Sequence, residues 1–211
     1  MTDSNTKTRI LDCAEELFAR DGFHNTSLRG LTARADVNLA AVNYHFGSKE
    51  ALLEAVIDRH LLPLNQIRRD KIAAVLTAAQ DQQRLPSVRA LLRAFVAPTL
   101  EFRNSGPGAR AFIALIGRSL SEPDATVRQC FMERVMPLFQ YLQQALSCAL
   151  PHLPAAILLT RLHFVIGSMS HVMCSTEQPA TEEALLELPL AREELIEQLL
   201  NFVCAGLEAP A

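Results

Sequence analysis

Residues 26–53 read TSLRGLTARADVNLAAVNYHFGSKEALL, and this stretch decides the fold. Thr26 and Ser27 are both residue types that cap helix N-termini. The apolar residues that follow recur at helical spacing on one face: Leu28, Leu31 and Ala35. Residues 36–38 then break this helix before a second short helix at 39–46. The pattern predicts a helix, a tight turn and a helix.

The second of these helices divides into a buried face and an outward face. Val42 and Phe46 are four residues apart, so they supply the buried face. Five side chains are left outward: Ala40, Ala41, Asn43, Tyr44 and His45. In a helix-turn-helix protein the second helix lies in the DNA major groove, where its exposed side chains meet base edges. This arrangement favours DNA reading over catalysis.

The end of the stretch carries its own stop and start signals. Gly47 suits a helix C-terminus that needs positive φ, and Ser48 can cap the next helix. Leu52 and Leu53 return that next helix to the core. Each local signal therefore agrees with the helix-turn-helix interpretation.

Residues 43–53, NYHFGSKEALL, resemble the signature of the TetR family of bacterial transcriptional regulators. Residues 10–23, ILDCAEELFARDGF, look like the family's first helix and its Gly-Phe exit. The resemblance covers roughly the first 55 residues. It implies a three-helix DNA-binding head followed by a helical domain for dimerisation and effector binding. One departure is Asp36, which stands in the turn where the family often has glycine.

Candidate DNA contacts come from residue chemistry and from the resemblance. Asn43 can pair bidentately with an adenine edge, and Arg29 could reach a guanine or a phosphate. Ala40 and Ala41 are small enough to touch a thymine methyl group. The positions that match the family's phosphate contacts are Thr26, Ser27, Tyr44, His45 and Lys49. Asn38, in the turn, completes the predicted DNA-binding set.

Tyr44 has an alternative role in this set. Its ring could pack partly against Leu53 or Phe23 rather than face DNA. Both roles are compatible with one side chain, since tyrosine has an apolar ring and a polar tip.

Composition bounds the class of protein. The chain has 211 residues, 49% of them hydrophobic and 20% charged, enough for one or two closely packed domains. Residues 1–6 are polar, and no uninterrupted apolar run approaches the roughly 20 residues of a membrane span. We therefore expect a soluble, cytoplasmic protein that does not enter a membrane. The five cysteines are widely spaced without a Cys-x-x-Cys pair, so buried thiols are expected and zinc or disulfide frameworks are not.

Charge gives no global sign of nucleic-acid binding, because the formal net charge is −3. Within residues 22–49, three Lys or Arg stand against one Asp, which leaves a net charge of +2. A head with so few cations binds phosphates weakly, so two copies are needed for useful affinity. The predicted DNA is double-stranded and palindromic, and the predicted protein is a homodimer.

The rest of the chain predicts further helices, so the fold class is all-α. No strand-like alternation or repeat occurs. The predicted domains are residues 1–55 and 56–211. A helix from Lys49 is expected to kink or break at Pro63 and to resume from Leu64. The other predicted helices are 8–21, 88–103, 109–120, 125–150, 155–173 and 191–207. Residues 175–190 are predicted to form a loop with a short helical piece, and most sides of the helix at 155–173 are expected to be buried.

No local motif supports a nucleophile and base held together, so the chain is not expected to be an enzyme, and no cofactor or metal is expected. His163 and His171 lie on a similar face of one helix, and Cys174 follows three residues later. Core or interface packing, an effector contact and a metal site are all open for them. Arg110, Arg118 and Arg161 on apolar helices either pair with an acid such as Glu133 or meet an acidic effector.

An apolar small molecule, a fatty acid or its thioester among the candidates, is predicted to bind the second domain and to weaken DNA binding. Pro98 and Pro137 would bend two helices there and open a cavity. Residues 161–167, RLHFVIG, are similar to PsrA-type regulators, which respond to fatty acids. The candidate effector residues are Phe95, Phe102, Phe112, Ile116, Arg118, Phe131, Phe139, His163 and Phe164.

The predicted dimer interface uses the helices at 155–173 and 191–207. Gly167 and Ser170 let a second helix approach closely, while three larger side chains supply apolar area. These three are Leu195, Leu199 and Phe202.

Two other classes of protein stay open from the sequence. A helical enzyme or small-molecule carrier would turn over or hold a ligand without binding DNA. A helical adaptor acting through protein contacts would leave the outward Asn43, Tyr44 and His45 without a purpose.

Overall fold

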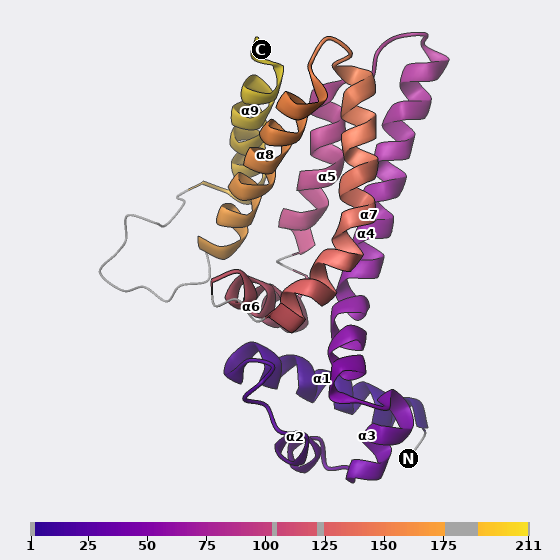
Figure 1. The fold of residues 1–211 in the computed structure, drawn as a ribbon, viewed down its shortest axis with the longest axis vertical. Coiled ribbons are helices and arrows are strands. Elements are labelled where there is room, and N and C mark those ends of the chain that lie inside the picture. The colour runs from indigo at the N-terminus through magenta and orange to yellow at the C-terminus, as the bar shows by residue number, and fades with distance from the viewer. Residues whose placement is uncertain (1–2, 103–104, 122–124, 176–189, 211) are drawn as a thin grey trace, which may run out of the picture. The chain divides into compact units, whose positions relative to one another are not determined.

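The structure is a computed structural model that describes residues 3–102, 105–121, 125–175 and 190–210 (Figure 1). These residues form nine helices and no strand, which confirms the predicted all-α fold class. The helices are α1 (Asp3–Asp21), α2 (Leu28–Ala35), α3 (Leu39–Phe46), α4 (Lys49–Asp81), α5 (Val88–Phe102), α6 (Pro107–Ser121), α7 (Ala125–Ala149), α8 (Ala155–Ser175) and α9 (Arg192–Glu208).

Of the kink or break predicted at Pro63, the break is wrong, because α4 is one continuous helix, and the kink stays a prediction. Proline removes a single backbone donor and crowds the preceding turn, and an exposed position lets water satisfy the carbonyl that loses its partner. Pro63 is exposed and Pro98 is buried, and α4 and α5 continue through them, so exposure alone does not decide whether a helix continues. Pro98 and Pro137 also lie inside helices, α5 and α7. Most of the predicted loop at 175–190 falls outside the described residues.

Side-chain caps fix the ends of the short N-terminal helices. Ser27 is the N-cap of α2, and its Oγ accepts a hydrogen bond from Gly30 N at 3.0 Å. Ser48 Oγ accepts from Ala51 N at 3.0 Å at the start of α4. Gly47 ends α3 with φ of 80°, as predicted. These caps define the two-helix motif without help from distant residues.

The chain divides into two compact units that interleave along the sequence. Unit 1 contains Met1–Pro63 and Asn104–Arg134, and unit 2 contains Leu64–Arg103 and Val135–Ala211. In unit 1, α1 packs against α2, α3 and α6. The predicted domain division into 1–55 and 56–211 stays a prediction.

The core of unit 1 is apolar, and Arg134 on α7 forms a polar network within the same unit. Ile10, Phe18, Leu31 and Val42 are fully buried. Arg134 donates to Asp58, to Glu54 Oε2 at 3.1 Å and to the Cys130 carbonyl at 3.1 Å. These hydrogen bonds, the one to Asp58 foremost, raise the pKa of Arg134. The network therefore ties α4 to α7 inside unit 1.

A buried carboxylate joins three helices of unit 1. Glu15 on α1 is buried, and its Oε2 lies 2.8 Å from His60 Nε2 on α4. Its other oxygen, Oε1, has no hydrogen-bond partner. A Cβ atom placed on Gly108 of α6 would lie 2.6 Å from this Oε1 and 3.4 Å from His60 Cε1. Gly108 is therefore the position at which α6 can approach the carboxylate without a clash.

We expect Gly108→Ala to lower the free energy of unfolding by about 1–3 kcal/mol, because the added methyl group overpacks a filled site. Alanine would otherwise favour the helix over glycine. Chemical denaturation of Gly108→Ala, Glu15→Ala and the double variant checks this as a double-mutant cycle. The cost of Gly108→Ala should vanish when Glu15 is alanine. An equal cost in both backgrounds would contradict the clash with Glu15.

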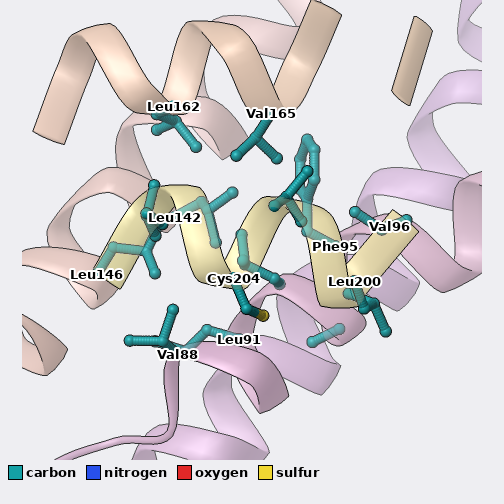
Figure 2. Packing of buried hydrophobic residues seen from close by; sticks show 14 of the residues in the cluster. Val88, Leu91, Phe95, Val96, Leu142, Leu146, Leu162, Val165, Leu200 and Cys204 are labelled. Atoms are coloured by element: carbon teal, nitrogen blue, oxygen red, sulfur yellow. The ribbon is translucent and has the colours of Figure 1, made fainter. Parts of the chain in front are cut away.

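Unit 2 has a separate apolar core formed by α5, α7, α8 and α9 together with Ile72 of α4. Figure 2 shows α9 lying among side chains from the other three helices. The labelled residues are Val88, Leu91, Phe95 and Val96 from α5, Leu142 and Leu146 from α7, Leu162 and Val165 from α8, and Leu200 and Cys204 from α9. Burial raises the pKa of the Cys204 thiol, so this cysteine is a packing residue, as predicted.

Polar contacts fix the ends of α9 in unit 2. Arg89 and Arg93 on α5 both pair with Glu197. Arg161 on α8 donates to the carbonyl oxygens of Leu207 at 3.0 Å and Pro210 at 2.8 Å. The start of α8 therefore lies beside the end of α9, and the two helices run antiparallel. The alternative that Arg161 pairs with an acid is not what the structure shows.

Candidate DNA-binding site

Helix α3 exposes three of the five side chains that the sequence assigned to its outer face, while Ala41 and His45 are half-buried. Asn43 and Ala40 are exposed, and Val42 is fully buried beneath them. Tyr44 is 78% exposed, and its ring meets the His45 ring edge-on at 5.1 Å. This exposure rules out packing of Tyr44 against Leu53 or Phe23 in the single chain. The helix therefore offers an amide, small side chains and an aromatic hydroxyl to solvent.

Asn38 is the N-cap of α3. Its Oδ1 accepts a hydrogen bond from Ala41 N at 2.8 Å, so its carbonyl oxygen already has an intramolecular role. The side chain is exposed, and its amide nitrogen is the group that could face a phosphate. Ala41 is half-buried, which makes Ala40 the more accessible of the two alanines.

Thr26 does not have the predicted role at the DNA surface. Its side chain is 4% exposed, and its hydroxyl donates to the carbonyls of Gly22 at 2.8 Å and Leu17 at 3.2 Å. A phosphate cannot reach a hydroxyl that is buried and already donating. The neighbouring Ser27 is exposed and is the N-cap of α2. Thr26 is therefore a core residue, and Ser27 is a surface residue.

Arg29 lies on the exposed face of α2 and has no ion-pair partner among the described residues. Lys49 is half-buried at the start of α4. Its ammonium lies 4.5 Å from the centre of the Phe23 ring and 3.4 Å from the His24 carbonyl oxygen. Lys49 is therefore held in place by a cation–π contact, and its phosphate contact stays a prediction.

The turn accommodates Asp36 in the left-handed conformation, with φ of 49°. Arg9 of α1 donates to the Asp36 carbonyl at 2.7 Å and to its Oδ2 at 3.2 Å. The aspartate side chain is almost fully exposed, so the ion pair offsets its charge only in part. Arg34 likewise pairs with Glu16 at 2.5 Å. Few cations of the head are left for phosphates.

The predicted effector residues are divided between the two units. Phe112, Ile116 and Phe131 belong to unit 1, whereas Phe95, Phe102 and Phe139 belong to unit 2. Phe95, Phe112 and Ile116 are buried, and Phe102, Phe131 and Phe139 are half-buried. The side chain of Arg118 lies outside the described residues. The assignment of these residues to an effector site stays a prediction.

Phe164 and His163 lie on the outer face of α8, and the prediction that they line an internal site is wrong for the single chain. Phe164 is 68% exposed. His163 Nδ1 is 2.8 Å from the Leu159 carbonyl oxygen, and its ring meets the Phe139 ring at 5.6 Å. The prediction that α8 is buried on most sides is wrong, because its buried residues form a single stripe: Leu158, Leu162, Val165, Met169 and Val172.

The predicted dimer residues also separate by burial. Phe202 is 70% exposed and Gly167 is exposed, while Ser170 and Leu195 are half-buried. Leu199 is buried in the core of its own unit, so it cannot contribute area to a partner. The spacing of apolar residues in α9 does not show which face packs in the core of the chain and which face is left open for a partner.

No metal site is present within the parts of the chain that the structure describes, where no three of His, Cys, Asp and Glu form a metal-binding group. His163 and His171 are both exposed on α8, and the Cys174 side chain is outside the described residues. Burial raises the pKa of Cys130 to about 11, so this thiol stays protonated at neutral pH.

Arg68 of α4 is a buried charged residue that the sequence analysis did not single out. Its side chain is 4% exposed and contacts Asn65, Thr99 and the Phe95 ring. A signal was present, because Leu64, Arg68 and Ile72 are spaced four apart and so share a helix face. A charged residue in the middle of an apolar helix face is expected to be buried with that face.

The arrangement of α1, α2 and α3 defines a helix-turn-helix protein, with α3 in the position of a recognition helix. The family profile described as "Bacterial regulatory proteins, tetR family" matches residues 10–56. A second profile, "Tetracyclin repressor-like, C-terminal domain", matches residues 93–206, more than half of the chain. The chain belongs to the TetR family of bacterial transcriptional regulators. Members of this family are DNA-binding transcriptional regulators.

Curated relatives resemble this chain over part of its length. The HTH-type transcriptional regulator UidR of Escherichia coli strain K12 is 40% identical over 52 residues, 25% of this chain and 26% of that protein. The HTH-type transcriptional regulator BetI of Paraburkholderia phymatum is 30% identical over 118 residues, 56% of each chain. The matches thus span about a quarter to a half of these relatives.

Solved structures share the fold over nearly the whole chain. The fatty acid degradation regulator FadR from Bacillus halodurans superposes with a TM-score of 0.69, 13% identity and coverage of 97% of each chain. The probable transcriptional regulatory protein RHA5900 gives a TM-score of 0.63 at 18% identity, covering 97% of this chain and 100% of its own. At such identities the likeness establishes the fold alone.

One described helix, α8, is long and apolar enough over Ala155–Met173 to cross a membrane by composition. A single helix of this kind is weak evidence, because a packed helix of a soluble protein passes the same test. Family membership gives α8 another role as a helix of the C-terminal domain.

Proposed function

We propose that the protein is a ligand-responsive repressor that binds a palindromic operator as a homodimer and releases it when an apolar small molecule binds. The observation that carries the DNA part is the capped helix α3, which exposes Asn43 and Tyr44 over a buried Val42. Rigid caps hold these side chains in one orientation, which base reading requires. A protein of this class acts in the cytoplasm.

Base reading and phosphate binding fall to different residues in this proposal. Asn43 pairs with an adenine edge, and Ala40 lies against a thymine methyl group. Arg29 reaches a guanine or a phosphate from α2. The backbone phosphates are bound by Ser27, Asn38, Tyr44, His45 and Lys49.

The dimer uses the open faces of α8 and α9. Arg161 places the start of α8 beside the end of α9, so Phe164 and Phe202 lie at about the same level of the antiparallel pair. Two large, exposed aromatic side chains on neighbouring helices are the kind of anchor that protein interfaces bury. A two-fold operator needs a two-fold protein, and this surface supplies it.

Phe202→Glu is expected to weaken the dimer tenfold or more, because an interface would have to bury an unpaired carboxylate. Since Phe202 is 70% exposed, the fold of the chain should be unaffected. Sedimentation at micromolar concentration checks the mass, and thermal unfolding checks the fold. The control is Asn201→Asp, which adds a carboxylate to the same helix beside Arg89 of its own chain. A dimer unchanged by Phe202→Glu would exclude this surface.

The ligand is an apolar molecule, with a fatty acid or acyl thioester as the specific candidate. A regulator of fatty acid degradation from Bacillus halodurans shares the fold, which is why an acyl compound is chosen as the specific candidate. Ligand binding regulates DNA binding only if the ligand prefers the conformation in which the two heads do not fit the operator. Titration of operator-bound protein with long-chain acyl compounds tests this part.

Selection of genomic fragments by the purified protein tests the DNA part. The expected result is a set of short sequences that share one palindrome. The same protein with Tyr44, His45 and Lys49 changed to alanine should select nothing. Undiminished selection by that triple variant would overturn the assignment of α3 as the reading helix.

A further inference from the structure

Arg68 is a guanidinium inside the apolar core of unit 2. It lies on α4 one turn after Leu64 and one turn before Ile72, both of which are buried. Across from it, α5 supplies Phe95 and Thr99, which are also buried. Arginine is almost never placed in such surroundings without a charged partner.

Within the described part of the chain, the partners of Arg68 are neutral. Nη1 donates to Asn65 Oδ1 at 3.0 Å, and Nη2 donates to Thr99 Oγ1. The guanidinium carbon lies 4.9 Å from the centre of the Phe95 ring. Nε has no hydrogen-bond partner. A guanidinium carries five N–H donors, so two hydrogen bonds leave it incompletely satisfied.

No carboxylate pairs with Arg68 among the residues that the structure describes, in contrast to Arg89, Arg93 and Arg134. Burial lowers the pKa of Arg68 to about 9, which leaves the group charged at neutral pH. A buried charge without a counter-ion is costly, and a bound ligand of opposite charge would offset that cost.

We propose that Arg68 is the anchor for the acidic head group of an aliphatic carboxylate, which is the effector of this regulator. The proposal rests on the proposed function, since it names the ligand class for the ligand-responsive domain. The free Nε–H and the Nη groups form the planar fork that binds a carboxylate bidentately. The aliphatic body of the ligand would be surrounded by the apolar side chains that enclose Arg68, such as Ile72 and Phe95.

A structural role is the competing explanation, in which Arg68 only bridges α4 to α5 through Thr99. The two roles differ for Arg68→Met, which keeps the length of the side chain and removes its charge. An anchor residue without its ligand destabilises the free protein, so Arg68→Met should melt at the same temperature or a few degrees higher. A bridging residue would give a lower melting temperature.

The binding test compares carboxylates with neutral analogues on the full-length protein at pH 7. The probes are octanoate, decanoate and hexadecanoate, with 1-decanol as the neutral match for decanoate. Wild-type protein should bind decanoate more tightly than 1-decanol. Arg68→Met should lose about 30-fold or more in decanoate affinity and nothing for 1-decanol. Arg68→Lys should keep part of the preference, since it retains the charge without the planar fork.

Lys71→Met is the matched control, because it removes one exposed charge from the same helix. It should leave both affinities unchanged. Equal binding of decanoate and 1-decanol by the wild type, retained decanoate binding in Arg68→Met, or no saturable binding of any carboxylate would each overturn the proposal. Operator binding without ligand is measured in parallel. If the protein does not bind the operator, the result counts against the proposed function alone. If it binds the operator but does not bind carboxylates, the result counts against the role of Arg68 alone.

Discussion

Asn43→Ala is expected to weaken operator binding by about 1–3 kcal/mol per half-site, because a bidentate contact with one base is lost. Across the two half-sites of a palindrome the loss becomes about 2–6 kcal/mol, or about 30-fold to 10⁴-fold in affinity. Asn43 is exposed on α3 above the buried Val42, so its removal should not affect folding. Titration of the variant against the selected operator and against random DNA measures the loss.

The control for this experiment is Gln144→Ala, which removes an exposed amide from α7 in unit 2. It should bind the operator like the wild type. Asn43→Ala should also stop discriminating at a single base position in each half-site. An equal loss on operator and random DNA would show that Asn43 contacts the backbone and not a base.

Phe18→Ala is expected to lower the free energy of unfolding by about 3–5 kcal/mol, the usual cost of removing a buried phenylalanine ring. Phe18 is fully buried on α1. Its ring meets the Phe23 ring edge-on, with centroids 5.4 Å apart, so the substitution removes an aromatic contact and leaves a cavity. Urea denaturation followed by circular dichroism measures the change.

Tyr44→Ala provides the matched control, because it removes an aromatic side chain of the same head that is almost fully exposed. Its effect on stability should stay within about 0.5 kcal/mol. Phe18→Ala should lose DNA binding only to the extent that the head unfolds, whereas Tyr44→Ala should lose DNA binding while folded. A small stability cost for Phe18→Ala would mean that the neighbouring helices collapse into the space.

The head could be predicted from sequence because its signals are local. Ser27, Ser48 and Gly47 each fix a helix end within a few residues of themselves, so neighbouring residues carry the information. Pro63 was predicted wrongly for the opposite reason. Helices α4, α5 and α7 all continue through a proline, and whether packing outweighs the lost hydrogen bond depends on residues that are distant in sequence.

The division of Thr26 and Ser27 into different roles could not be predicted. Both residues can cap a helix, and both have a hydroxyl group that can bind phosphate. The carbonyls of Leu17 and Gly22, which belong to the preceding helix and its exit, bind the Thr26 hydroxyl. Only the packing of α1 on the motif decides which hydroxyl is buried.

The burial and placement of the residues assigned to an effector site were the least predictable from the sequence. The sequence prediction chose these residues mainly because they are phenylalanines. In the structure they belong to two different units, and Phe164 lies on an exposed surface. Arg68 was missed because the sequence prediction singled out arginines only on the apolar helices after residue 109. Spacing along α4 would have found it, since positions four apart share a face.

The glycine at position 108 limits how this regulator can be recombined with others. Helix α6 belongs to the same compact unit as the first three helices, and its Gly108 faces the Glu15 carboxylate. A chimera made by cutting after the helix-turn-helix would set Glu15 against a foreign helix. Most residues at that position would carry a Cβ atom into the carboxylate oxygen. Exchange of DNA specificity between regulators should therefore keep this glycine, or move residues 104–134 together with the head.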